Sequence, residues 1–106
     1  MMKFMILASY SAEGAKGVLK AGSGTDRKQM TQTMISELGG KMEAYYYTND
    51  CDAYVLCELP DNAAAAAISL SIKASGMGSV KTTVLLEAEE VDKAAKLTVK
   101  YRQPGN

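Results

Sequence analysis

The stretch YYYTNDCDAYVL, residues 45–56, decides the fold, because two β-forming runs flank a short polar turn. Three tyrosines precede the turn, and a run of aromatic, β-branched and aliphatic residues follows it, which is the composition that strands prefer. Asn49 and Asp50 tolerate the positive φ values that a two-residue hairpin turn needs. We therefore predict an antiparallel hairpin between a strand at 41–48 and a strand at 52–59.

A two-residue turn would also fix which hairpin residues share a face of the sheet. On one face we expect an aromatic pair and an opposite-charge pair, both of which stabilise sheets. The pairs on that face would be Tyr47–Asp52, Tyr45–Tyr54, Glu43–Leu56 and Lys41–Glu58. The other face would carry Tyr46–Ala53, Ala44–Val55 and Met42–Cys57, whose small and apolar members suit contact with helices.

Strands and helices alternate outward from the hairpin. The apolar run at 3–10 and the run SVKTTVLLE at 79–87 are predicted to be strands. One helix is expected from the capping residues at 23–26 to Leu38, where Gly39 and Gly40 stop it, and another from the cap Asp61 to Gly76. Residues 88–99 begin with acids and continue with lysines, which favours an additional C-terminal helix.

The glycines of residues 11–24 are expected to break up that segment. Residues 20–28, KAGSGTDRK, resemble a phosphate-binding loop only superficially, because they lack both the Gly-Lys-Ser/Thr ending and the Gly-x-Gly-x-x-Gly spacing. We interpret this stretch as a flexible kink between two helical segments, which could act as a flap over the space between helices and sheet.

The order of elements predicts an α+β, ferredoxin-like βαββαβ fold with an extra C-terminal helix. Residues 1–106 would form a single domain, with a four-stranded antiparallel sheet of order 4-1-3-2 and both main helices on one face. The other face would be bare. It would add Met5, Leu7 and Ser9 from the first strand and Lys81, Thr83, Leu85 and Glu87 from the fourth. An aromatic and aliphatic face of this size is typical of an interaction surface, so we expect a homodimer that packs sheet against sheet.

Composition excludes several partners. Twelve basic residues balance twelve acidic ones, so we expect no binding to nucleic acid. The N-terminal run MMKFMILASY is too short for a membrane span, and a cytoplasmic protein is predicted. Cys51 and Cys57 would lie about 20 Å apart on an extended strand, too far for a disulfide, so free thiols are expected.

The sequence contains no histidine. It therefore lacks the commonest general base, zinc ligand and haem ligand. Asp50, Asp52 and Glu43 do not have the dense spacing of a calcium loop. We predict neither a metal nor a cofactor.

Two groups of side chains are candidate sites. In the predicted register Tyr45, Tyr47, Tyr54 and Asp52 converge at one end of the open face, where the rings could stack on a flat ligand while Asp52 accepts a hydrogen bond or acts as a base. The alternative, which we favour, is that they are cross-strand pairs and a turn aspartate buried in a dimer interface.

Ser9 and Lys81 are expected near the opposite end, with Lys41 and Glu58. A desolvated lysine there could be a nucleophile or an anion site, although pairing with Glu58 explains these charges more simply. Cys51 has two acidic neighbours and no histidine to activate it, so an inert exposed thiol is favoured over a reactive one.

Segments along nearly the whole chain resemble the GYD domain family, small bacterial proteins of uncharacterised function named after a Gly-x-Tyr-Asp motif in this hairpin. The similar segments are MILASYSAEGAKGVLK at 5–20, LGGKMEAYYY at 38–47, DAYVLCELPDNAAAAA at 52–67, VKTTVLL at 80–86 and YRQPG at 101–105. The motif itself is degraded. Asn49-Asp50-Cys51-Asp52 keeps the aspartate, replaces glycine by another residue that tolerates the left-handed region, and loses the tyrosine hydroxyl.

The resemblance implies a dimeric α/β-barrel built from two ferredoxin-like protomers. Members of that wider superfamily include small monooxygenases, isomerases, haem-degrading enzymes and proteins with no known activity, so it implies no particular reaction. Our first hypothesis is a homodimer that binds a small aromatic or apolar ligand, with or without cofactor-independent chemistry. The site would be either between helices and sheet or on the tyrosine-lined face. The alternatives are a non-catalytic assembly or interaction module and a redox-sensing thiol at Cys51. Association beyond the dimer stays open.

Overall fold

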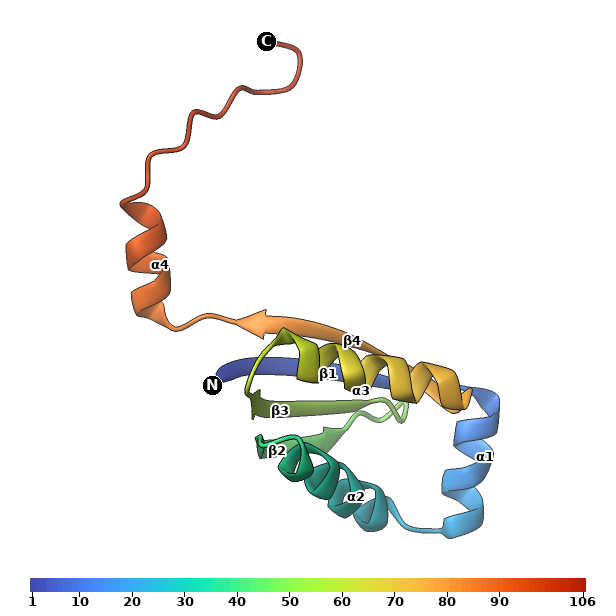
Figure 1. The fold of residues 1–106 in the computed structure, drawn as a ribbon. Coiled ribbons are helices and arrows are strands. Elements are labelled where there is room, and N and C mark those ends of the chain that lie inside the picture. The colour runs from blue at the N-terminus through green and yellow to red at the C-terminus, as the bar shows by residue number, and fades with distance from the viewer.

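Four strands and four helices alternate along the chain in a computed structural model that describes residues 1–106 (Figure 1). The predicted strands and helices are all present, and the helical segment expected before the kink at 20–28 is a helix of its own. The elements are β1 Met2–Tyr10, α1 Ala12–Ala21, α2 Gly24–Glu37, β2 Lys41–Tyr47, β3 Ala53–Leu59, α3 Asn62–Ser75, β4 Gly78–Leu85 and α4 Ala88–Ala95.

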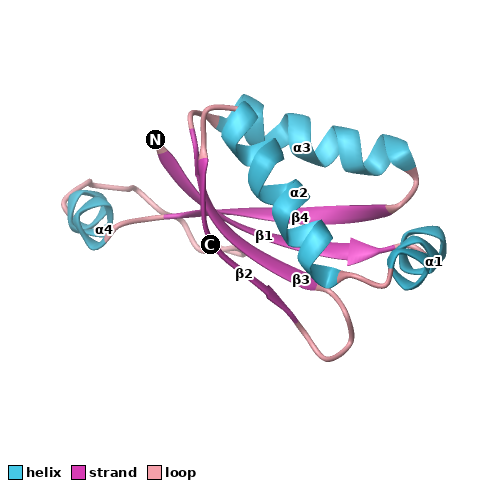
Figure 2. Ribbon diagram, turned by 90° about the horizontal axis from the view of Figure 1, so that it is seen from below, coloured by secondary structure: helices cyan, strands magenta, loops and turns pink.

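The four strands form one antiparallel sheet with the order β2-β3-β1-β4. This is the predicted order read from the opposite edge, and it is compatible with the ferredoxin-like arrangement. Helices α2 and α3 lie on the same face of the sheet (Figure 2), as predicted. The other face carries no helix.

The core fills the layer between the sheet and these two helices. Alternate residues of β1 and β3 point into it, because successive side chains of a strand face opposite ways. Ile35 from α2 and Ile68 from α3 complete the core on the helix side. The buried cluster comprises Phe4, Ile6, Ile35, Val55, Cys57, Leu59, Ala65 and Ile68.

Both sheet-covering helices begin and end where the sequence predicts. The Ser23 hydroxyl accepts a hydrogen bond from the Asp26 amide at 3.1 Å, and the Asp61 carboxylate accepts one from the Ala64 amide at 2.9 Å. Gly39 and Gly76 adopt left-handed φ values of 83° and 73° just after the helices. These caps fix the length of each helix over the sheet.

The expectation that glycines break up residues 11–24 is wrong for the first half of that segment, which is helix α1. Ser11 caps it and also ties it to the turn before β4. The Ser11 amide donates to the Met77 carbonyl at 2.9 Å, and its hydroxyl donates to the Gly76 carbonyl at 2.6 Å. Gly14 packs directly on the Met77 carbonyl, where a Cβ atom has no room. Gly22, with φ 65°, then ends α1.

The two-residue hairpin turn is also wrong. The loop has three residues, because the Thr48 amide donates to the Asp52 carbonyl at 2.8 Å and Cys51 adopts φ 64°. A three-residue loop ending in a left-handed residue is a common hairpin connection. A β-bulge at Glu43 then restores the predicted pairs at the far end, Met42 with Cys57 and Lys41 with Glu58.

Between loop and bulge every predicted pair shifts by one residue. Tyr45 is opposite Val55 and Tyr46 is opposite Tyr54, whereas we expected Tyr45 opposite Tyr54 and Tyr46 opposite Ala53. Because the side-chain period of a strand is two, this shift moves Tyr45 and Tyr47 to the face covered by helices. Tyr46 takes the place on the open face, where it is 72% exposed.

Residues 86–106 form an arm that leaves the domain. From Leu86 onward the chain runs away from the sheet, through α4 and an extended tail (Figure 1). The radius of gyration is 17.1 Å, whereas a compact chain of this length has about 13 Å. None of the four helices combines the length and apolar character of a membrane span.

Candidate functional site

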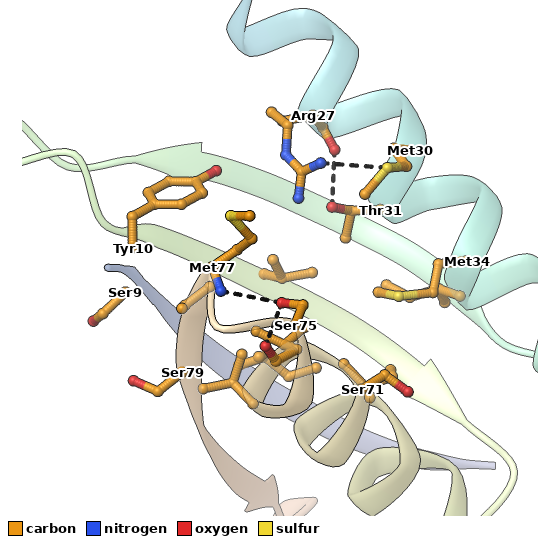
Figure 3. Close-up of a pocket in the computed structure, with 18 of the residues that line it drawn as sticks. Ser9, Tyr10, Arg27, Met30, Thr31, Met34, Ser71, Ser75, Met77 and Ser79 are labelled. Atoms are coloured by element: carbon orange, nitrogen blue, oxygen red, sulfur yellow. Dashed lines mark hydrogen bonds between the residues drawn. The ribbon is translucent and has the colours of Figure 1, made fainter. Parts of the chain in front are cut away.

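A cavity of about 350 Å³ lies between the sheet and helices α2 and α3 (Figure 3). Its inner wall is apolar and is continuous with the core. Arg27 is the only charged residue that lines it. The lining residues are Ile6, Ala8, Ser9, Tyr10, Arg27, Met30, Thr31, Met34, Ile35, Tyr45, Val55, Ile68, Ser71, Ile72, Ser75, Met77, Gly78, Ser79 and Val80.

Two of the predicted tyrosines meet at this site, though on the opposite face from the one expected. The rings of Tyr45 and Tyr47 stack edge to face, with centroids 5.2 Å apart and planes at 77°. The Tyr45 hydroxyl donates to that of Tyr47 at 3.2 Å, and the Tyr47 hydroxyl donates to the Gly24 carbonyl at 3.1 Å. This chain of hydrogen bonds joins β2 to the first residue of α2.

Burial raises the pKa of Tyr45, and the neighbouring hydroxyls of Tyr47 and Tyr10 act in the same direction. Burial also raises the pKa of Tyr47. Both phenols are therefore neutral at physiological pH. They can give and accept hydrogen bonds, but they are poorly suited to act as bases.

The other four candidate residues do not join this pair. Tyr54 lies on the open face, 43% exposed and opposite Tyr46. Asp52 belongs to the hairpin loop, where its amide donates to the Thr48 hydroxyl at 3.1 Å. The predicted convergence of Tyr45, Tyr47, Tyr54 and Asp52 on one face is therefore wrong, because loop and bulge together shift the register.

Ser9 and Lys81 lie on strands β1 and β4, as expected. Ser9 is opposite Ser79 at the rim of the cavity, and Lys81 is opposite Leu7 on the open face. The ion pair on this face joins Lys3 to Glu43, with Nζ and Oε1 3.3 Å apart. The hydrogen bond that Lys3 donates to this carboxylate, together with the negative charge of Glu43, raises the pKa of Lys3.

The thiols are free, as predicted, and they differ in their surroundings. Cys51 is exposed in the hairpin loop, whereas Cys57 is buried in the core. Burial raises the pKa of the Cys57 thiol to about 11, and the charge of Glu43 contributes in the same direction. Histidine, cysteine and acidic side chains do not gather anywhere into a group of three or more that could hold a metal ion.

The sequence predicts an apolar stripe of Met30, Met34, Ile35 and Leu38 on helix α2. Arg27 and Thr31, which also line the cavity, were not predicted, and they lie on the same side of α2 because residues three and four apart are neighbours on a helix. Met77 lies in the turn before β4. The helical spacing from Arg27 to Met34 was the available signal, since it places a cation at the start of an apolar stripe.

The sequence model of the GYD domain matches residues 4–95, from within β1 to the last residue of α4. The chain belongs to the GYD domain family. This confirms the resemblance seen in the hairpin and its flanking segments. No curated protein and no solved structure matches the chain. The GYD domain is defined by its sequence and not by an activity, so a function has to be argued from the cavity and the surfaces.

Proposed function

We propose that this GYD domain protein binds a small aromatic or apolar ligand in the cavity between the sheet and helices α2 and α3. The observation that carries the proposal is the cavity itself. Its volume of about 350 Å³ is at the lower end of the range for small-molecule sites. Its wall is mostly apolar, and its few polar groups could orient a ligand.

A more specific form of the proposal is that the protein also catalyses a cofactor-independent reaction of the bound ligand. The cavity offers tyrosine hydroxyls and an arginine but no histidine and no carboxylate. These groups polarise or hold a bound molecule more readily than they abstract a proton from it. The lining therefore supports binding more directly than catalysis.

We further propose a homodimer in which the open faces of two sheets pack together as an α/β-barrel. The chain exposes 7670 Å², whereas a compact protein of 11.3 kDa exposes about 5,700 Å². Much of that excess of roughly 2,000 Å² belongs to the C-terminal arm, whose residues are all exposed, and the interface itself needs about 800 Å² of the open face on each partner. Tyr46 and Tyr54 on the open face are of the residue type that interfaces favour. Free thiols at Cys51 and Cys57 fit a reducing, cytoplasmic compartment.

The second candidate function is a non-catalytic assembly module, and the C-terminal arm favours it. The arm exposes large apolar side chains far from the core of its own chain. They are Leu86, Val91, Leu97, Val99 and Tyr101, each more than half exposed. In this account the arm of one copy packs on another copy, and association extends beyond the dimer.

The ligand-binding proposal is tested with N-phenylnaphthylamine, a neutral aromatic probe whose fluorescence rises in apolar surroundings. We expect saturable binding of one probe molecule per chain. Met34→Trp, which fills the cavity, should abolish it, whereas Gln32→Trp introduces the same side chain on the exposed side of α2 and should leave it unchanged. Circular dichroism checks that both variants are folded. Absence of saturable binding, or equal binding by both variants, would refute the proposal.

Native mass spectrometry of the protein purified from its own host tests the assembly. A dimer that releases a discrete small mass on collisional activation supports both the ligand and the homodimer. A dimer without such a mass favours the assembly module. A monomer at micromolar concentration contradicts the sheet-to-sheet interface.

A further inference from the structure

Most polar groups of the cavity lie toward one end, and Ser71 lies away from them (Figure 3). Strand β1 and helix α3 finish at the polar end, and helix α2 and strand β4 begin there (Figure 3). Tyr10, Arg27 and Ser75 come from three of these elements. The inner end, toward Ile35 and Val55, merges with the core and is apolar. A ligand in this cavity would therefore have a polar end and an apolar end.

The Arg27 guanidinium at the polar end lacks a matching anion. It takes part in neither of the two ion pairs of the chain, Lys3–Glu43 and Lys16–Glu13. Its hydrogen bond goes from Nη1 to the sulfur of Met30 at 3.3 Å. A thioether is a weak acceptor, and a guanidinium has five N–H donors. The cation therefore has most of its donors unused beside an apolar cavity.

The hydroxyl groups near Arg27 differ in whether they already donate a hydrogen bond within the protein. The Tyr45 and Tyr47 protons are used in the chain that ends on Gly24, and the Ser75 hydroxyl donates to the Ile72 carbonyl at 2.6 Å. The Tyr10 hydroxyl lies beside those of Tyr45 and Tyr47 and raises the pKa of both, and its ring lines the cavity. The one charged donor group at this end is thus the Arg27 guanidinium, most of whose donors are unused.

Such a set of donors selects an oxyanion. We infer that the ligand is an apolar monocarboxylate, with its carboxylate bound by Arg27 and its apolar body against Met34, Ile72 and Val80. A guanidinium matches a carboxylate with two parallel hydrogen bonds. One unit of positive charge suits one unit of negative charge, which favours a carboxylate over a doubly charged phosphate. This inference rests on the proposed ligand-binding function and names the class of its ligand.

The test compares two competitors that share an apolar body. Phenylbutyrate is ionised at neutral pH, and phenylbutanol carries a neutral hydroxyl in place of the carboxylate. Each displaces N-phenylnaphthylamine from the wild-type protein, and we expect the carboxylate to bind at least about tenfold more tightly, as a charge-assisted hydrogen-bonded pair requires. Equal affinities, or a preference for the alcohol, would overturn the inference.

The variants Arg27→Gln and Arg102→Gln test whether Arg27 is responsible for the preference for the carboxylate. They make the same chemical change, and Arg102 is the other arginine of the chain, in the exposed tail. Arg27→Gln should remove the tenfold preference while the alcohol binds as before, and Arg102→Gln should retain it. A preference that survives in Arg27→Gln would refute the assigned role. Because N-phenylnaphthylamine is neutral, its failure to bind would refute ligand binding in the cavity. Equal affinities for phenylbutyrate and phenylbutanol would refute only the preference for a carboxylate.

Discussion

Two glycines of helix α1 should respond in opposite ways to the same substitution. Gly14 faces the turn before β4, and an added Cβ would lie 2.9 Å from the Met77 carbonyl carbon and even closer to its oxygen. At Gly17 nothing lies within 4 Å of that position. We therefore expect Gly14→Ala to destabilise the protein and Gly17→Ala to stabilise it.

The magnitudes follow from the local contacts. Relieving the overlap at Gly14 costs about 1–3 kcal/mol, as other overpacked sites do. It also strains the two hydrogen bonds from Ser11 to Gly76 and Met77, each contributing about 0.5–1.5 kcal/mol. The higher helix propensity of alanine offsets about 0.5–1 kcal/mol of this loss of stability. Gly14→Ala should therefore cost about 2–4 kcal/mol net, and Gly17→Ala should gain about 0.5–1 kcal/mol.

Urea unfolding followed by circular dichroism measures both free energies of unfolding. Thermal unfolding gives an independent measurement, because Tm shifts by about 4–8 °C for each kcal/mol of stability in a domain of this size. Gly14→Ala as stable as the wild type would show that α1 does not dock on the Met77 carbonyl. Loss of stability in both variants would refute the explanation from packing.

Other positions give equally direct tests. Cys51→Gly should stabilise the protein by about 0.5–1 kcal/mol in urea unfolding, because φ 64° disfavours a side chain; a loss would argue against this loop conformation. Thr82→Val should add about 1 kcal/mol, since the Thr82 hydroxyl is buried without a partner, whereas Thr83→Val on the open face should change stability by less than about 0.5 kcal/mol. The raised pKa of Tyr45 means that the unfolded chain ionises first, so the free energy of unfolding should hold below pH 10 and fall above it by up to about 1.4 kcal/mol per pH unit. Tyr45→Phe should lessen that fall, and an unchanged slope between pH 9 and pH 11 would contradict it.

Local signals in the sequence were sufficient for most of the fold. The cap residues Ser23 and Asp61 and the stops at Gly39 and Gly76 act within a few residues of themselves, so they can be read without the tertiary structure. The order of strands and helices then limits the sheet to very few topologies. The open face, the position of Lys81 on it and that of Ser9 near the end of β1 follow from that order.

The candidate site was harder to predict, because its residues depend on non-local geometry. A bulge at Glu43 leaves no clear signature in a stretch of strand-forming residues, yet it decides which tyrosines face the helices. The helix at Gly14 depends on a carbonyl more than sixty residues away in the chain. Arg27 is a candidate ligand-binding residue because no carboxylate of the chain forms an ion pair with it. A sequence does not show which charged side chains lack a partner in the fold.

The loop at 49–51 and the bulge at Glu43 compensate for each other, so the tyrosine that faces the cavity is set by chain length and not by residue type. Deleting one loop residue while straightening the bulge would slide the intervening segment by one place. Ala44 would then take the place of Tyr45 opposite Val55, Tyr46 would take that of Tyr47 opposite Ala53, and the pairing of Lys41 and Met42 with β3 would be unchanged. Single-residue insertions and deletions in this hairpin thus give evolution a route to a different binding surface that leaves the remaining strands in place.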